Sequence, residues 1–384
     1  MAISLTITTG MSEEIQQLEY DRVMMRRALE LASRGAGQVS PNPMVGAVIT
    51  DSNGAVIAEG YHHEYGGPHA EVDALQQVAG RDLSDATLYV TLEPCSHHGQ
   101  TPPCADLVAE SGIRRVVTAM RDPNPLVDGR GNRRLREGGL EVVVGVLENE
   151  SRRLNEAWIH FIRTGKPFIT IKVAQSLDGY IALPDGESQW ITGELARQHV
   201  HMIRSKADAI LVGTRTALYD NPSLTVRYGL PGRNPKRIVL DRSLELPHDL
   251  KLFTDEFREN TTVFVGEDMM EAPRAYQLRD NGIGVETIPV EGNPDNLRLD
   301  HVIDRLGQMN LTSVLVEGGA AVIDTLIAEN LADKLILFIA PKLLGHGIKS
   351  FQRLAVDRLD QATILNIHST ELVGEDIMVE GYLR

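Results

Sequence analysis

The sequence predicts two consecutive α/β domains, for three reasons. Strand-like apolar runs alternate with segments in which apolar residues recur at helical spacing. The 384 residues are more than one ordinary domain needs. The sequence Thr-Gly-Lys-Pro at 164–167 interrupts the alternation near the middle of the chain. We therefore expect a poorly ordered extension over residues 1–19, a first domain over 20–165 and a second domain over 166–384.

The first domain is expected to begin with a helix over 21–34, because Met24, Ala28 and Leu31 recur at helical spacing and glycines follow. Two strands, over 44–49 and 55–59, flank an Asp-Ser-Asn-Gly turn and are typical of an antiparallel hairpin. The remaining elements alternate: a helix from residue 69, a strand over 87–92, a helix from 104, strands near 116 and 142, and a helix over 148–163.

The second domain is expected to contain six strands, over 169–174, 209–212, 237–240, 262–265, 313–316 and 335–339. No G-x-G-x-x-G sequence follows a strand here, so a Rossmann dinucleotide site is not supported. Glu317-Gly-Gly319 does follow a strand and precedes an apolar helix over 320–328. Such a turn can present N–H groups to a phosphate, although a glycine pair before a helix is more often only a turn.

Composition and charge exclude several classes of function. The net charge is −15, and residues 1–165 hold 15 Lys and Arg against 22 Asp and Glu, so neither half is basic. Aromatic residues make up 5% of the chain and do not alternate with basic ones. We therefore expect no nucleic-acid partner. The start of the chain lacks the pattern of a signal peptide, and no apolar run reaches about 18 residues. We expect a cytoplasmic protein without a membrane partner.

A metal site is the strongest functional signal. The sequence contains His69-Ala-Glu71, then Pro94-Cys95 and then Cys104, the only other cysteine. One imidazole and two thiolates suit zinc and leave a fourth tetrahedral position open for water, which is typical of a catalytic site. Glu71, two residues after His69, can face this site without being a ligand and transfer protons. We predict one zinc ion per chain, with Glu71 as the catalytic acid–base group.

This pattern matches the zinc nucleobase-deaminase signature H-x-E…P-C-x-x-C only in general form, because eight residues separate the two cysteines. A closed structural zinc site is the alternative, and His97 or His98 could supply its fourth ligand. That alternative would leave Glu71 without a role.

Seven segments together resemble the bifunctional deaminase–reductase family of riboflavin biosynthesis, from about residue 21 to the C-terminus. The wide cysteine spacing is the pattern of that family, while Gln100 stands where Arg or Lys is common and Gly67 where Glu often occurs. The segments are 41–46 (PNPMVG), 66–71 (GGPHAE), 93–104 (EPCSHHGQTPPC), 172–179 (KVAQSLDG), 186–192 (GESQWIT), 220–227 (DNPSLTVR) and 316–319 (VEGG).

The resemblance implies a cytidine-deaminase-like first domain that removes the 2-amino group of 2,5-diamino-6-(5-phosphoribosylamino)pyrimidin-4(3H)-one. Asn42 and His62 match positions that shape the pyrimidine pocket. The loop over 96–98 lies between two ligands and should border the site, and the segment 122–124 (DPN) resembles a further substrate loop. From its own context alone, Asn42 could equally be a turn residue between two prolines.

The resemblance also implies a dihydrofolate-reductase-like second domain that uses NADPH to reduce the ribosyl group to ribityl. Positions matched to substrate contacts are Lys172 near the reacting sugar, Ser188, Arg204, Leu224, Arg227 and Glu317. Positions matched to NADP contacts are Ala174, Trp190, Thr216, Asp220, Gly319, Ala320, Ala321, Val322 and Ile323. A guanidinium fork suits a ribose phosphate, which supports the two arginines.

Simpler interpretations exist for several of these positions. Arg204 and Arg227 could be surface arginines, and Trp190 could be a core aromatic. For the whole chain, the rival functions are a nucleic-acid-editing deaminase with an appended binding domain and a zinc-stabilised interaction protein. The expected partners are a small phosphoribosyl-pyrimidine substrate and further copies of the same chain, as a dimer or tetramer.

Overall fold

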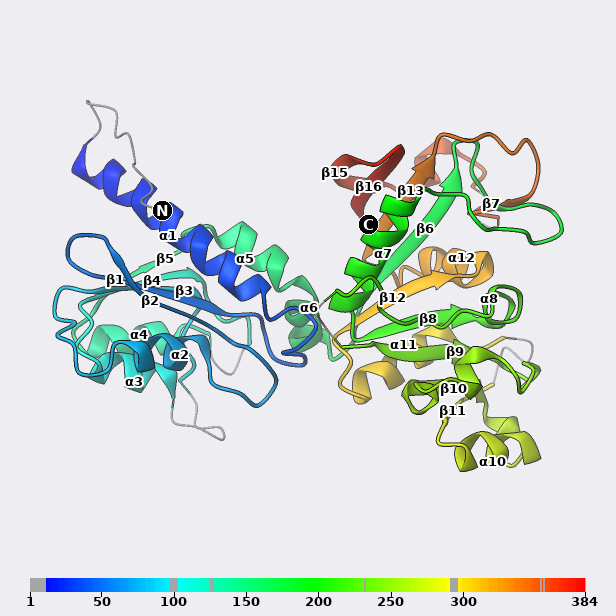
Figure 1. Ribbon diagram of the computed structural model, residues 1–384, viewed down its shortest axis with the longest axis horizontal. Helices are drawn as coiled ribbons and strands as arrows, with labels where there is room; N and C mark the ends of the chain where they lie inside the picture. The colour runs from blue at the N-terminus through cyan, green and yellow to red at the C-terminus, as the bar shows by residue number, and fades with distance from the viewer. Residues whose placement is uncertain are drawn as a thin grey trace. The chain divides into compact units, whose positions relative to one another are not determined.

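Two sheets, one in each half of the chain, organise the computed structural model (Figure 1). The chain divides into two units, Met1–Arg163 and Thr164–Arg384, each with its own hydrophobic core. The structure describes residues 12–96, 103–124, 128–230, 233–290, 296–352, 354 and 356–383. His97, His98 and Gln100, which the sequence analysis singled out, lie outside these ranges.

The first unit is built on a five-stranded sheet with the order β2-β1-β3-β4-β5. Its strands are β1 (Gly46–Thr50), β2 (Val56–Tyr61), β3 (Thr87–Leu92), β4 (Arg115–Met120) and β5 (Glu141–Val144). Strands β1 and β2 form the predicted antiparallel hairpin, and β1 is also antiparallel to β3. Strands β3, β4 and β5 are parallel, so their carboxyl ends share one edge, where ligands bind in α/β sheets.

Helices cover both faces of this sheet (Figure 1). One face packs against α1 (Glu13–Ser33), with α5 (Glu148–Leu154) beside it, and the other packs against α2 (Ala70–Gln77), α3 (Cys104–Glu110) and α4 (Arg130–Glu137). The period of two along a strand assigns each residue to a face: Val48 packs toward α1, whereas Ala47 and Ile49 pack toward α2. The fold class predicted for this half is therefore confirmed.

Two predicted boundaries in the first unit are wrong. Helix α1 begins at Glu13, so residues 13–19 are not part of a poorly ordered extension. Its first two turns contain only two apolar residues, Ile15 and Leu18, and both are exposed, but acidic side chains at Glu13 and Glu14 suit a helix N-terminus. The helix predicted over 148–163 is divided into α5 and α6 (Glu156–Thr164) at Asn155. The buried Asn155 amide instead bonds both backbone groups of Met44, at 2.8 and 2.9 Å.

The second unit is built on a nine-stranded sheet with the order β11-β10-β9-β8-β12-β6-β13-β16-β15. It is parallel from β11 to β13 and ends in the antiparallel pair β16 and β15. The bounds are β6 (Phe168–Ser176), β8 (Ala209–Gly213), β9 (Lys236–Leu240), β10 (Thr261–Gly266), β11 (Gly284–Ile288), β12 (Ser313–Gly318), β13 (Lys334–Ala340), β15 (Leu365–Val373) and β16 (Asp376–Leu383). Strands β7 (Tyr180–Ala182) and β14 (Ile348–Lys349) form a separate pair.

All six strands predicted for this unit are present, but five others were not predicted. Strands β7 and β14 are too short to show a pattern, and β11 is half-buried along most of its length. Strand β15 is exposed on most of its residues, so neither of its faces has an apolar period. Strand β16 was missed together with this edge strand, to which it pairs.

The helices of the second unit lie between successive parallel strands, as right-handed crossover connections require. They are α7 (Glu194–Lys206), α8 (Thr214–Asp220), α9 (Lys251–Thr254), α10 (Pro273–Asp280), α11 (Leu299–Gln308) and α12 (Ala320–Ala328), with 3₁₀ turns at Arg258–Asn260, Glu267–Met269 and Leu359–Gln361. Within the described ranges, no helix combines the length and the apolar character needed to cross a bilayer.

Candidate functional site

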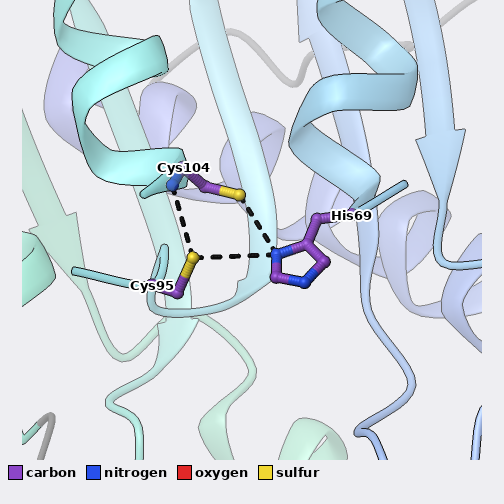
Figure 2. A group of neighbouring side chains, drawn as sticks. All are labelled: His69, Cys95 and Cys104. Carbon is purple, nitrogen blue, oxygen red and sulfur yellow. Dashed lines mark hydrogen bonds between the residues drawn. The ribbon is translucent and has the colours of Figure 1, made fainter. Parts of the chain in front are cut away.

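Three potential metal ligands converge at one edge of the five-stranded sheet (Figure 2). His69 is the N-cap of α2, Cys95 follows β3, and Cys104 is the first residue of α3. His69 Nδ1 lies 3.1 Å from Cys104 Sγ and 3.7 Å from Cys95 Sγ. The Cys104 backbone N–H also donates to Cys95 Sγ at 3.3 Å. Residues far apart in the sequence therefore meet because each stands at the end of an element.

The donor set and its spacing fit zinc. The three ligand atoms all lie within 4.8 Å of one another. Tetrahedral zinc, with bonds of about 2.0–2.3 Å, separates its ligand atoms by roughly 3.5–3.8 Å. Hydrogen bonding with Cys104 and with the His69 ring lowers the pKa of the Cys95 thiol, which favours the thiolate that binds a metal. Among the described residues the cluster has three members, and His97 and His98, the alternative fourth ligands, lie outside these residues.

Glu71 lies in the first turn of α2 and is 3% exposed. Burial, followed by the nearby Cys95 sulfur, raises the pKa of its carboxyl group to about 7. A carboxyl group with a pKa near neutrality can both accept and release a proton, as general acid–base catalysis requires. Glu71 therefore stands beside the ligand cluster, in an environment suited to proton transfer.

The predicted pyrimidine-pocket residues lie next to the cluster and contact each other. The His62 ring is edge-on to the His69 ring, with centroids 5.6 Å apart. His62 Nδ1 donates to the Pro68 carbonyl at 2.8 Å, which leaves Nε2 to accept from the Asn42 amide at 3.1 Å. Burial lowers the pKa of His62, which favours this neutral form. Asn42 is thus part of a side-chain network and is more than a turn residue.

Glu93, which the sequence analysis did not single out, anchors the loops around this site. It is 3% exposed, and its carboxylate accepts backbone N–H groups of Asp122, Gly129 and Asn132 at 3.1, 3.1 and 3.0 Å. Two of these donors belong to the N-terminus of α4, whose N–H groups have no partner within the helix. Glu93 therefore joins the Cys95 loop to the loop that contains Asp122. In the sequence, the only signal for this role of Glu93 was its position directly before Pro94-Cys95.

In the second unit, a buried carboxylate between two cations marks the predicted substrate site. Glu317, at the end of β12, lies 3.2 Å from Lys172 Nζ and 2.8 Å from Arg204 Nη2. Val316 pairs with Ile171 on the parallel strand β6, so Lys172 and Glu317 are neighbours across the sheet. Burial opposes ionisation of Glu317, but Arg204 and Lys172 outweigh it and hold its pKa well below the usual range.

The structure distinguishes the two arginines that the sequence analysis treated alike. The side chain of Arg204 is only 12% exposed, and besides its two bonds to Glu317 it donates from Nη1 to the Thr225 carbonyl at 3.2 Å. The surface interpretation of Arg204 is therefore wrong. Arg227 is exposed on the same loop as Thr225, and its backbone N–H donates to His201 Nδ1 at 3.2 Å. Of the two, Arg227 has the more accessible guanidinium group.

The predicted NADP positions gather where β8 and β12 end. Gly318 has φ +146°, and a Cβ there would lie 2.8 Å from Thr216 Oγ1, so this turn requires glycine. A Cβ on Gly213, at the end of β8, would lie 3.0 Å from Val322 of α12. Gly319 is the N-cap of α12, whose first N–H groups are available to an anion. Thr216 and the start of α12 are therefore adjacent.

The remaining predicted positions differ in what they can contribute. Ser188 Oγ donates to Asp220 at 3.3 Å, and burial raises the pKa of that carboxyl group. Trp190 is 59% exposed and stacks with the Arg197 guanidinium 4.5 Å above its ring, so it is not a core aromatic.

Leu224 and Ile323 are buried in hydrophobic clusters, so only their backbone groups can face a ligand. Ala174, Ala320 and Ala321 are half-buried or exposed near these positions.

Family comparisons assign both halves of the chain. Residues 18–120 match the family model of the cytidine and deoxycytidylate deaminase zinc-binding region. Residues 167–379 match the family model of the RibD C-terminal domain. The riboflavin biosynthesis protein RibD of Actinobacillus pleuropneumoniae is 42% identical over 359 residues, which are 93% of each chain. RibD of Escherichia coli is 39% identical over 370 residues, covering 93% of this chain and 98% of that protein.

Solved structures support the same relationship across both units. Acinetobacter baumannii RibD superposes with a TM-score of 0.85 at 35% identity, covering 96% of this chain and 99% of that one. The diaminohydroxyphosphoribosylaminopyrimidine deaminase/5-amino-6-(5-phosphoribosylamino)uracil reductase of Thermotoga maritima superposes with a TM-score of 0.84 at 38% identity, covering 96% and 100% of the two chains.

We predict that Glu93→Ala destabilises the first unit, because three buried N–H groups lose their shared acceptor. We expect the free energy of unfolding to fall by at least about 2 kcal/mol, since each buried unpaired group costs about 1–3 kcal/mol. Urea denaturation measures this change. Glu110→Ala, at an exposed position on α3, is the control and should behave like the wild type. Equal stability of the two variants would contradict the anchoring role of Glu93.

Proposed function

The chain belongs to the RibD family of bifunctional riboflavin-biosynthesis enzymes, and from this premise we propose which residues carry its two reactions. It is a zinc-dependent deaminase and an NADPH-dependent reductase that acts on a small molecule, with a cytidine-deaminase-like domain followed by a dihydrofolate-reductase-like one. The single observation that carries the residue assignment is the convergence of His69, Cys95 and Cys104 beside the buried Glu71.

In the deaminase domain we assign His69, Cys95 and Cys104 as the ligands of one zinc ion. Zinc, when bound, supplies the Lewis acidity that makes water nucleophilic at neutral pH. Glu71 accepts a proton from the attacking water and transfers protons to the pyrimidine ring nitrogen and to the amino group, which leaves as ammonia. The carbonyl oxygen of the product therefore comes from water. The Thermotoga maritima relative supports a diaminopyrimidine carrying a phosphoribosylamino group as the substrate.

Asn42 and His62 are assigned to hold the pyrimidine. His62 donates to the carbonyl of Pro68, the residue directly before the zinc ligand His69. This hydrogen bond therefore orients the His62 ring and also holds the backbone that leads into His69. Its other ring nitrogen orients Asn42. The pair therefore presents oriented polar groups beside the reacting carbon without adding a charge.

We predict that Glu71→Gln retains zinc but loses ammonia release by at least roughly 10²-fold, because an amide cannot transfer the proton. Cys104→Ser should lose zinc as well as activity, which separates the proton-transfer role from the ligand role. Metal analysis and an ammonia assay on both variants test the assignment. Near-normal ammonia release by Glu71→Gln, or unchanged zinc in Cys104→Ser, would refute the corresponding role.

In the reductase domain we assign Lys172 and Glu317 to the reacting sugar. NADPH, when bound, supplies the hydride that C1′ of the ribosyl group receives. As the bond from C1′ to the ring oxygen breaks, that oxygen requires a proton. The Lys172 ammonium is assigned as its donor, and the ionised Glu317, 3.2 Å from Lys172 Nζ, orients this group. Ser188 is assigned to the substrate from its place beside Asp220.

The phosphate of the substrate is assigned to Arg227 with the backbone of Leu224 nearby. Arg204 is assigned a supporting role, because three of its nitrogens already donate to protein acceptors. The coenzyme is assigned to the positions around the turn between β12 and α12, which are Thr216, Asp220, Gly319, Ala320, Ala321, Val322 and Ile323, together with Ala174 and Trp190.

We predict that Arg227→Ala lowers kcat/KM for the reduction by roughly 10- to 150-fold, since hydrogen bonds to a charged group contribute about 1.5–3 kcal/mol. NADPH affinity, zinc content and ammonia release should change little. Steady-state NADPH oxidation on deaminated substrate measures the effect. Arg358→Ala, which changes an arginine whose side chain is 73% exposed in the same domain, is the matched control. Wild-type kinetics of Arg227→Ala would make Arg227 a solvated surface residue.

The sequence also predicts a homo-oligomer in the cytoplasm, and two features support this proposal. Strand β15 is an edge of the nine-stranded sheet, and its Ile367 and Leu372 are 66% and 76% exposed. An edge with exposed apolar side chains is suited to pairing with a second copy of the chain. Both cysteines are free thiols, which fits a reducing compartment.

We predict a solution mass of two or four chains, measured by light scattering coupled to size-exclusion chromatography. Leu372→Lys should shift the population toward the monomer, because a lysine on an edge strand opposes pairing. A monomeric wild-type protein at micromolar concentration would contradict the proposal.

A further inference from the structure

The loop over residues 221–228 is held in a conformation that its own sequence disfavours. Asn221, Leu224 and Tyr228 have φ values of 38°, 50° and 67°. Residues with a Cβ rarely adopt this left-handed region, least of all a leucine or a tyrosine. Such a backbone persists only where surrounding groups hold it in place, and clustered departures of this kind are found at ligand-binding sites. The same loop carries Arg227.

Four side chains from outside the loop bond its backbone at nearly consecutive residues. Their backbone partners are the Ser223 and Thr225 carbonyls and the Val226 and Arg227 N–H groups. The contacts are Arg237 Nη1 to Ser223 O at 3.1 Å, Arg204 Nη1 to Thr225 O at 3.2 Å, Val226 N to Asn234 Oδ1 at 2.8 Å, and Arg227 N to His201 Nδ1 at 3.2 Å. The backbone that carries Arg227 is therefore positioned before any substrate binds.

His201 makes the contact nearest to the Arg227 side chain. It lies on α7 one turn before Arg204, is 4% exposed, and packs edge-on against the Tyr228 ring at 5.1 Å. Burial, with Arg204 and Arg227 nearby and Glu317 opposing them, lowers its pKa to about 4. The ring is therefore neutral at physiological pH. Because Nδ1 accepts the Arg227 N–H, the ring proton is on Nε2.

We propose that His201 is a positioning residue of the reductase, whose Nδ1 fixes the Arg227 backbone so that the guanidinium group is directed toward the substrate phosphate. This inference rests on the proposed function of Arg227. A neutral imidazole suits the task, because it accepts a hydrogen bond without adding a third positive charge between two arginines. Preorganising Arg227 in this way reduces the ordering that substrate binding would otherwise require.

The effect should fall on substrate binding rather than on hydride transfer, because His201 acts through a residue assigned to the phosphate and not to the reacting sugar. His201→Leu removes the acceptor and keeps an apolar side chain of similar size. His201→Asn keeps an acceptor, since Oδ1 of asparagine can occupy the place of Nδ1. The two variants therefore differ in the one group on which the inference depends.

The experiment uses the full-length zinc enzyme and measures KM and kcat for NADPH-dependent reduction of the deaminated substrate. We expect His201→Leu to raise KM by about 2- to 12-fold, the size expected for one neutral hydrogen bond, with kcat little changed. His201→Asn should remain close to the wild type. The dissociation constant of NADPH and the rate of ammonia release should be the same in all variants, which also reports that both domains are folded.

Arg227→Ala and the double variant His201→Leu/Arg227→Ala complete a cycle that tests whether His201 acts through Arg227. We expect the double variant to have the KM of Arg227→Ala alone. A wild-type KM for His201→Leu, a KM for His201→Asn as high as that of His201→Leu, or additive effects in the double variant would overturn the inference while the role of Arg227 stands. A wild-type KM for Arg227→Ala would overturn the assignment of Arg227 and, with it, our inference.

Discussion

Buried carboxylates hold both active sites together, because a charge that is removed from water must find donors inside the protein. In the deaminase domain Glu93 finds three backbone N–H groups, and in the reductase domain Glu317 finds Lys172 and Arg204. Each of these bonds ties a loop or strand end to its neighbour. The geometry of each site is therefore set by the need to satisfy one buried negative charge.

The environment of the buried carboxyl group differs between the two sites. In the deaminase domain burial and the nearby Cys95 sulfur outweigh the opposing effect of His69 and raise the pKa of Glu71, the proposed proton-transfer group, to about 7. In the reductase domain the two cations outweigh burial and keep Glu317 ionised. Two buried glutamates therefore have pKa values shifted in opposite directions, upward for Glu71 and downward for Glu317. The difference arises from the neighbours that each sheet edge brings together.

Much of the fold and of the zinc site could be predicted from the sequence. The bounds of β3 and α12 and the start of α3 were predicted from local patterns, and His69, Glu71, Cys95 and Cys104 were identified from residue type and spacing. Strand β15 and the first turns of α1 were not predicted, because their few apolar side chains, such as Ile15, Leu18 and Ile367, are exposed and do not form a continuous buried face. The reductase residues were found only through a family resemblance, since they lie on separate elements with no common local motif.

The sequence by itself determined where strands and helices alternate, where the chain divides and which residue types can bind zinc, because these properties depend on neighbours along the chain. Only the tertiary structure decided that Arg204 is paired with Glu317 while Arg227 is exposed, and that His201 contacts the Arg227 backbone. The two arginines differ in exposure because burial and hydrogen bonding depend on packing between distant segments. That packing is not encoded in any short stretch of sequence.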